Sequence, residues 1–195
     1  EVDGNVTAGS TVALGANSKV SADSAGDGGN VTAETTVALG AGASVAGTVE
    51  SINSTVTLGV GAYVKGKTTA ASSVTLGADA YTCDSVLASS AATLGVGAFV
   101  DGNLLAPTLT VAAGSFVIHN IIGTTGTLGA NACFGGVFTV TTPTKGAGAG
   151  KCNFNHSYNG IRIDAVNNDF KECGTLTSTQ VNSAIASANI EAELK

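Results

Sequence analysis

The chain has 195 residues but no methionine or tryptophan, and aromatic residues make up only 5% of it. Charged residues account for 11%, the formal net charge is −6, and Arg162 is the one arginine. Nucleic-acid binding needs clustered lysine and arginine, so this composition argues against a nucleic-acid partner. No run of 18 apolar residues occurs, so the sequence predicts no membrane span.

What the chain does have is glycine, alanine, serine, threonine and valine, which are typical of short strands and tight corners. A five-residue phrase recurs: residues 11–15 and 36–40 read TVALG, 55–59 TVTLG, 73–77 SVTLG and 91–95 AATLG, with weaker copies at 108–112 and 125–129. Successive copies lie 25, 19, 18, 18, 17 and 17 residues apart. A period this short and regular predicts a repeat architecture.

Each period contains three short strand segments separated by Gly, Asn or Asp corners, and this predicts an all-β fold. We expect a triangular β-solenoid of about seven coils, each of 17–19 residues, between about residues 4 and 135. Alternation along the strands predicts three inward columns of aliphatic side chains. Their members are Val12, Val37, Val56, Val74 and Leu109; Val6, Val31, Val49, Val86, Leu104 and Ile121; and Val20, Val45, Val64, Val100 and Val117.

The period stops after Phe138, which predicts a solenoid over residues 1–138 and a C-terminal tail over residues 139–195. Residues 141–150 have the composition of a linker, and residues 152–173 are expected to be rich in loops. The pattern of residues 177–195 predicts a short helix, with Val181, Ala184 and Ile185 on one face. We expect this tail to cap the solenoid or to dock on it.

Cysteines and sequons together indicate a secreted, extracellular protein. Cys83, Cys133, Cys152 and Cys173 suit two disulfides in an oxidising compartment, with three possible pairings, of which Cys152–Cys173 is favoured because it brackets a loop. Candidate glycosylation sites are the asparagines of four Asn-X-Ser/Thr sequons: Asn5, Asn30, Asn53 and Asn155. The chain also begins at Glu1 without a methionine, as a processed secretory protein would.

Residues suited to catalysis or metal binding are sparse. His119 and His156 have no Cys, Asp or Glu near them at metal-ligand spacing. Asp164 and Asp169 are more typical of a solvated loop than of a catalytic pair. The sequence therefore predicts neither an enzyme nor a cofactor.

One outer face is expected to carry an uncharged threonine array. Its candidate ice-facing residues are Thr55, Thr57, Thr75, Thr93, Thr108, Thr110, Thr125 and Thr127. Threonines of one strand would repeat at about 6.7 Å and those of neighbouring coils at about 4.8 Å. Such a grid of hydroxyl and methyl groups is typical of ice-binding surfaces, although threonine is also simply a favourable outward residue on a strand.

A second outer surface is expected to be apolar and to act as a docking surface. Its residues are Tyr63, Tyr81, Phe99, Phe116 and Ile118, with Leu87, Leu105 and Ile122 on an adjacent face. Soluble monomers rarely leave such a surface bare, so either the C-terminal helix or a neighbouring molecule should cover it.

Two stretches carry a resemblance to known families. Residues 55–68 (TVTLGVGAYVKGKT) and 92–104 (ATLGVGAFVDGNL) resemble bactofilins, which form polymers by stacking end to end. Residues 89–116 (SSAATLGVGAFVDGNLLAPTLTVAAGSF) resemble late coils of the microbial and algal ice-binding β-solenoid family. The first resemblance implies self-assembly and the second implies ice binding. Neither extends into the tail.

The leading hypothesis from the sequence is a structural protein that assembles head to tail into an extracellular filament. A terminal coil exposes unpaired backbone groups, and the first coil starts near Gly4 with little sequence before it to cap it. Heterologous contacts between such ends produce open polymers. The alternative hypothesis is ice binding through the threonine array, and adhesion to cell-surface glycans is a weaker third.

Overall fold

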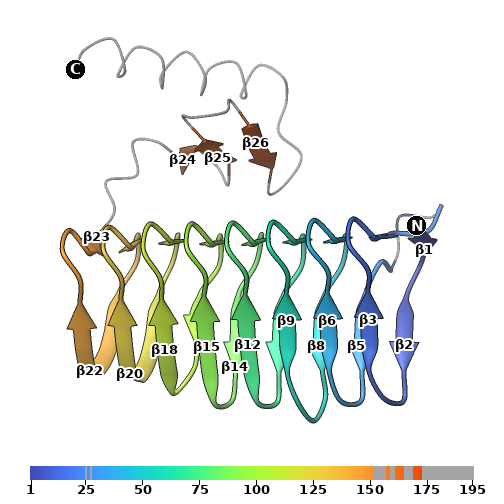
Figure 1. Cartoon of the computed structure of the whole chain (residues 1–195), viewed down its shortest axis with the longest axis horizontal. Coiled ribbons are helices and arrows are strands. Elements are labelled where there is room, and N and C mark those ends of the chain that lie inside the picture. Colours follow the sequence, from blue (N-terminus) through green and yellow to red (C-terminus); the bar gives the residue numbers. More distant parts are fainter. Residues whose placement is uncertain (25, 27, 152–156, 159–160, 165–168, 173–195) are drawn as a thin grey trace. The chain divides into compact units, whose positions relative to one another are not determined.

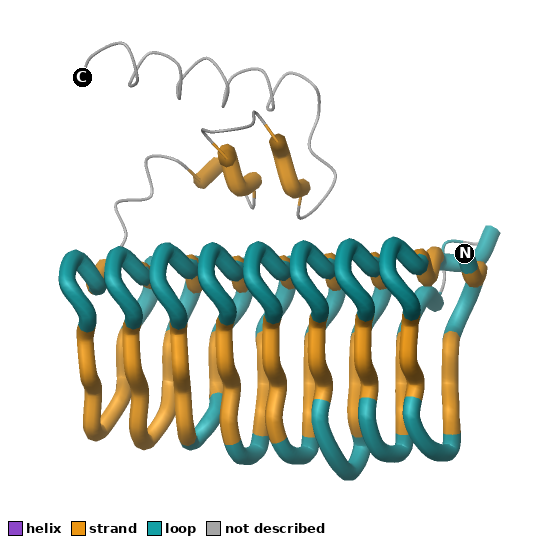
Figure 2. The backbone as a smooth tube through the Cα atoms, viewed as in Figure 1, coloured by secondary structure: helices purple, strands orange, loops and turns teal. Residues whose placement is uncertain are grey.

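The structure is a computed structural model that describes residues 1–24, 26, 28–151, 157–158, 161–164 and 169–172 (Figure 1). The chain divides into two compact units, Glu1–Cys152 and Asn153–Lys195. The first unit is a parallel β-solenoid of about eight turns, which confirms the predicted fold class. Short strands alternate with loops at the corners of every turn (Figure 2).

Three strands make one turn, and each of them belongs to one face of the solenoid. Face one contains β2 (Val6–Ala8), β5 (Val31–Ala33), β8 (Val49–Ser51), β11 (Thr68–Ala70), β14 (Val86–Ala88) and β17 (Leu104–Leu105). Face two contains β3 (Val12–Leu14), β6 (Val37–Leu39), β9 (Val56–Leu58), β12 (Ser73–Leu76), β15 (Ala91–Leu94) and β18 (Thr108–Val111). In turns seven and eight, β20 (Ile121–Leu128) and β22 (Phe138–Lys145) each run through both faces and join them into one sheet.

Face three is a separate parallel sheet of nine short strands. It contains β1 (Val2–Asp3), β4 (Lys19–Ser21), β7 (Ser44–Val45), β10 (Tyr63–Val64), β13 (Tyr81–Thr82), β16 (Phe99–Val100), β19 (Phe116–Val117), β21 (Cys133–Phe134) and β23 (Gly150–Lys151). Equivalent residues of consecutive repeats pair in register, as Tyr81 does with Tyr63 and with Phe99. Side chains of one type therefore form columns along the solenoid.

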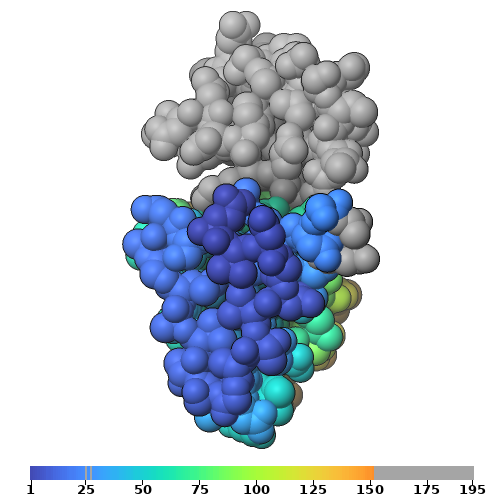
Figure 3. Space-filling view, turned by 90° about the vertical axis from the view of Figure 1, so that its right-hand side faces the viewer, coloured from blue at the N-terminus to red at the C-terminus, as the bar shows by residue number. Residues whose placement is uncertain are grey.

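The core consists of the three aliphatic columns that alternation predicts. Val31, Val56 and Val64, one from each face, are each completely buried. At the N-terminal turn Val6 and Leu14 are only partly buried, because no further turn covers that end. Figure 3 views this end, where atoms of the first turns fill the cross-section. The interior is therefore packed with side chains and leaves no channel.

The glycine of the repeated phrase is favoured because consecutive turns approach closely there. A Cβ atom added to Gly95 would lie 2.6 Å from the carbonyl carbon of Gly77 in the turn before. Turn six carries Ala112 at this position, and its N–H lies 3.0 Å from the carbonyl oxygen of Leu94. The equivalent hydrogen bonds of Gly77 and Gly95 measure 2.7 Å. One methyl group thus widens the stack locally.

A second column, at the corner between faces two and three, adopts the left-handed conformation in every turn. Its residues are Asn17, Gly42, Gly61, Asp79, Gly97, Gly114, Asn131 and Gly148, with φ between 54° and 70°. Only glycine, asparagine and aspartate occur there, since these residues adopt positive φ most readily. This corner is the same in all eight turns.

The solenoid continues past the predicted boundary at residue 138, so the expected linker at residues 141–150 is wrong. Strand β22 pairs with β20 over its whole length and β23 pairs with β21, which adds an eighth turn. Lys145 occupies the column position that leucine fills in earlier turns, opposite Leu128. The position lies at the end of the stack, where a charged side chain can reach water.

Aromatic rings close this C-terminal end of the core. The ring centroids of Phe134 and Phe138 lie 5.2 Å apart in a stacked arrangement. The Lys145 ammonium lies 5.0 Å from the centroid of Phe138 and 5.9 Å from that of Phe134. A cation over two rings covers apolar surface that a ninth turn would otherwise bury.

The second unit contains a three-stranded antiparallel sheet of β24 (Ser157–Tyr158), β25 (Ile161–Asp164) and β26 (Asp169–Glu172). Asp164 and Asp169 are paired opposite each other in it. The helix predicted for residues 177–195 lies outside the described residues. Within the described part of the chain, no helix is long and apolar enough to cross a membrane.

Candidate functional site: the threonine face

The outer positions of face two form a surface without any charged residue, which we call the threonine face. Each strand contributes two of these positions, on either side of one inward residue, so two columns run along the solenoid. The first column is Thr11, Thr36, Thr55, Ser73, Ala91, Thr108, Thr125 and Thr142. The second column is Ala13, Ala38, Thr57, Thr75, Thr93, Thr110, Thr127 and Thr144.

All eight threonines that the sequence assigns to this face lie on it together with Thr11 and Thr36, and two more extend it at its C-terminal end. Thr142 and Thr144 of β22 pair with Thr125 and Thr127, so the second column is threonine in six consecutive turns. The sequence contains a signal for them, because they follow Thr125 and Thr127 at the same 17-residue spacing. The predicted end of the solenoid at residue 138 concealed it.

The face is a regular grid exposed to solvent. Its strands lie side by side along the solenoid (Figure 1). Neighbouring turns repeat at about 4.8 Å, and the two threonines of one strand lie about 6.6 Å apart. Thr57, Thr75, Thr110, Thr127 and Thr144 are exposed, and Thr93 is half-buried.

Several of the hydroxyl groups are held by neighbours in the stack. The hydroxyls of Thr108 and Thr125 lie 3.4 Å apart, within hydrogen-bonding distance. The hydroxyl of Thr142 donates to the carbonyl oxygen of Thr124 at 3.2 Å. Threonine is also β-branched, and its χ1 angle is restricted on a strand. The positions of these oxygen and methyl groups are therefore largely fixed by the backbone.

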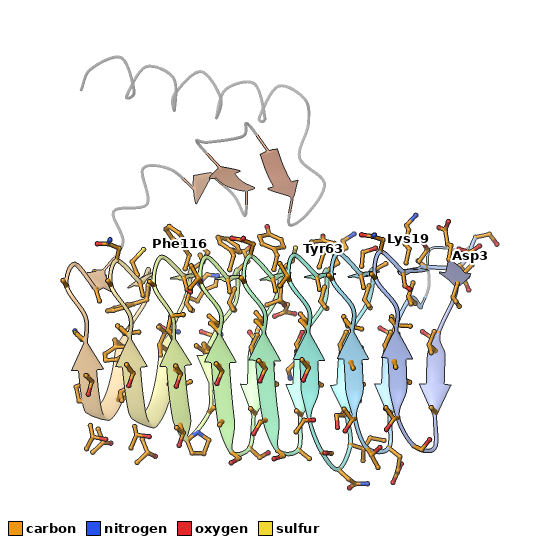
Figure 4. The ribbon with its side chains drawn as sticks, in the orientation of Figure 1. Asp3, Lys19, Tyr63 and Phe116 are labelled. Carbon is orange, nitrogen blue, oxygen red and sulfur yellow. The ribbon has the colours of Figure 1, made fainter. Side chains whose placement is uncertain are left out.

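The residues predicted as the docking surface lie on two faces, as alternation along the strands indicates. On face three, Tyr63, Tyr81 and Phe99 form a stacked column outside the aliphatic core, with centroid separations of 5.5 and 4.7 Å. Tyr63 and Phe116 project from this face (Figure 4). Tyr81 and Phe99 are buried, while Tyr63, Phe116 and Ile118 are half-buried. Docking of a tail or of a neighbour on this column stays a prediction.

The remaining three residues of that set lie on face one. Leu87 and Leu105 are half-buried and Ile122 is 42% exposed. Together with Thr69 and Pro107 they line an open groove of about 520 Å³. The groove is apolar, and none of its lining residues is charged.

Two of the four cysteines, Cys83 and Cys133, lie in the described turns. Cys83 and Cys133 are each disulfide-bonded. Cys133 is in register with Phe116, and Phe99 and Tyr81 follow in the same column, so three strand spacings, about 14 Å, separate it from the turn of Cys83. A disulfide requires Cα atoms within roughly 7 Å, so these two cysteines are not bonded to each other. Both Cys152 and Cys173 lie outside the described residues.

Potential metal ligands are dispersed over the described turns. Among the residues that the structure describes, no three His, Cys, Asp or Glu side chains lie close enough to hold a metal ion. His119 is exposed at a corner. Its closest charged neighbour in the same set of corners is Asp101, a half-buried carboxyl whose pKa is raised by burial. His156 lies outside the described residues.

A scan against protein-family models and searches of curated proteins and of solved structures found no match to this chain. The resemblances to bactofilins and to the ice-binding family therefore rest on the quoted sequence stretches alone. The feature on which they agree with the structure is the β-solenoid itself.

Proposed function

We propose that this is a secreted ice-binding protein and that the threonine face contacts ice. The observation that carries the proposal is the unbroken second column of threonines from turn three to turn eight, five of them exposed and Thr93 half-buried, at outer positions that include no charged residue. If the outer positions had only to keep the solenoid in solution, charged side chains would serve as well, as Glu50 does on face one. Six consecutive threonines on one face are more specific than that requirement.

The chemistry of the face suits an ordered water lattice. Each threonine offers one methyl group and one hydroxyl, and the hydroxyl both donates and accepts hydrogen bonds. Bridging waters are held well when their partners are fixed, since little further entropy is lost. The parallel backbone repeats these groups at constant intervals in two directions. Such a surface can hold many waters in one regular arrangement.

Charged groups lie away from the grid. Glu34 is at the corner before β6, and Lys145 is in the inward column rather than an outer one. Ammonium and carboxylate groups bind water strongly in their own geometry, so their absence from the outer positions favours contact with ice. The disulfides of Cys83 and Cys133 are consistent with an oxidising, extracellular compartment.

The test is thermal hysteresis, with ice-crystal shape recorded in the same experiment. Thr110→Tyr places a bulky ring in the middle of the second column, and we expect it to remove most of the activity. Thr139→Tyr is the matched control, because Thr139 is an exposed outer residue of face one. Both variants should keep the circular dichroism spectrum and the Tm of the parent protein. Equal activity of the two variants would contradict the assignment of the face.

Filament formation, the leading hypothesis from the sequence, is the second candidate function, and the last turn argues against it. In earlier turns the inward residue of face two donates its N–H to the following turn, as Val37 does to Thr55. The equivalent residue of β22 is Pro143, which has no N–H to donate. Proline and lysine on an edge strand are typical devices against further strand addition. Sedimentation velocity over a wide concentration range would decide, and a ladder of growing species would favour the filament.

A further inference from the structure

We propose that Asn53 carries an N-linked glycan in the secreted protein and that the sequons at Asn5 and Asn30 remain unmodified. The three sequons are equivalent as sequence motifs, but the solenoid places them differently. Two belong to a column that stacks the turns together, and the third lies on a protruding corner.

Asn5 and Asn30 have a structural task at the corner that precedes face one. The side-chain oxygen of Asn5 accepts the backbone N–H of Asn30 at 3.0 Å. The side-chain oxygen of Asn30 accepts the N–H of Thr48 at 2.7 Å and its hydroxyl at 2.9 Å. Each asparagine therefore satisfies a donor of the next turn. Space is tight as well, since a Cβ atom on Gly47 would lie 2.2 Å from the Asn30 oxygen.

The same asparagine column recurs where no sequon exists. The side-chain oxygen of Asn103 accepts the N–H of Asn120 at 3.1 Å, and that of Asn120 accepts the N–H of Val137 at 2.8 Å. Asn103 and Asn120 are followed two residues later by Leu105 and Ile122, so neither can be glycosylated. Stacking of the turns thus explains asparagine at this position without a glycan.

The threonines of those two sequons are likewise explained by the fold alone. Thr7 and Thr32 are outer residues of β2 and β5, paired in register. The same outer position on β11 is Thr69. Each of these threonines follows two residues after an asparagine of the stacking column. Asn-Val-Thr therefore arises twice without any role in glycosylation.

Asn53 lies on the corner between β8 and β9, which bulges out of the stack. In turn four, the N–H of Ala71 binds the carbonyl of Ser51 and the N–H of Ser72 binds that of Ser54. Ile52 and Asn53 therefore lie between the two acceptors that turn four uses, while their own N–H groups donate to the carbonyls of Ala33 and Glu34 in turn two. Ile52 is 46% exposed and Asn53 is exposed. This corner extends beyond the corresponding corners of neighbouring turns (Figure 2).

The Asn53 side chain is also available for the reaction. Its Nδ2 atom donates to the Glu34 carboxylate at 2.8 Å, an exposed contact of the kind that is easily given up. In the transfer, Nδ2 forms a bond to the anomeric carbon of an oligosaccharide held on a lipid pyrophosphate. The bond from that carbon to the phosphate oxygen breaks, the lipid pyrophosphate leaves, and Nδ2 loses one proton to a base of the transferase.

The experiment is secretion of the full chain from a eukaryotic host, followed by glycosidase release in heavy-oxygen water. This step converts each glycosylated asparagine into a labelled aspartate, which peptide fragmentation assigns to one residue. Thr55→Ala removes the Asn53 sequon and should abolish the label there, while Thr55→Ser keeps the sequon and should retain it. Thr7→Ala and Thr32→Ala remove the other two sequons but keep both asparagines, and should change nothing.

A labelled Asn53 with unlabelled Asn5 and Asn30 supports the proposal. A secreted chain with label on Asn5 or Asn30, or without label on Asn53, overturns it. Asn155 lies outside the described residues, and its occupancy is read from a separate peptide and does not affect the result. Ice binding is tested independently, so failure of one proposal leaves the other standing.

Discussion

Replacing Thr68 by valine should stabilise the solenoid, because its hydroxyl is buried without a hydrogen-bond partner. Thr68 is 0% exposed, and its Oγ1 atom is the one buried side-chain polar atom in the described residues for which no partner is found. It occupies an inward position of face one between Val49 and Val86. An unsatisfied buried donor costs about 1–3 kcal/mol. Valine has nearly the same shape and fills the same space with a methyl group.

We therefore expect Thr68→Val to raise the free energy of unfolding by about 1 kcal/mol, which for a chain of this size raises Tm by about 2–4 °C. The matched control is Thr82→Val. Thr82 is equally buried, but its hydroxyl lies 3.1 Å from the carbonyl of Asp84 and 3.3 Å from that of Gly66. Loss of that contact should lower stability. Urea denaturation followed by circular dichroism measures both variants, and a destabilising Thr68→Val would refute the reasoning.

Three further predictions concern the stack and its end. Gly95→Ala should lower the free energy of unfolding by about 1–3 kcal/mol, because the added methyl group forces the backbones of two turns apart. The midpoint of urea denaturation measures this loss. An unchanged midpoint would mean that the stack adapts to a methyl group as freely as it does at Ala112. Asp101→Asn should raise Tm at pH 7 but not at pH 3. Burial raises the pKa of Asp101, so stability is lost as the pH rises above about 3.8, and a gain of equal size at both pH values would contradict this. Lys145→Gln should lower the free energy of unfolding by about 0.5–1 kcal/mol, because the cation over the Phe138 ring is lost. Calorimetry measures the change, and an unchanged free energy of unfolding would show that the ammonium does not stabilise this end of the solenoid.

The fold was predictable because two periods coincide in the sequence. Alternation separates inner from outer residues within a strand, and the 17–19-residue repeat aligns one turn with the next. Val56 and Leu58 are buried and Thr57 between them is exposed, as that pattern requires. The eight threonines expected on face two follow from the same two periods.

What failed depends on neighbours in space rather than on pattern. The last turn was missed because an end turn needs no leucine in its inward column, and Lys145 replaces it there.

The measurement that tests the central claim most directly is incorporation into growing ice. A polycrystalline ice ball is grown slowly in a dilute solution of this protein and a similarly sized protein without ice affinity. The account predicts that the solenoid protein is enriched in the ice, that Thr139→Tyr is enriched equally, and that Thr110→Tyr is left in the liquid with the reference protein. Exclusion of the parent protein from the ice, while it remains folded in the liquid, would contradict the claim.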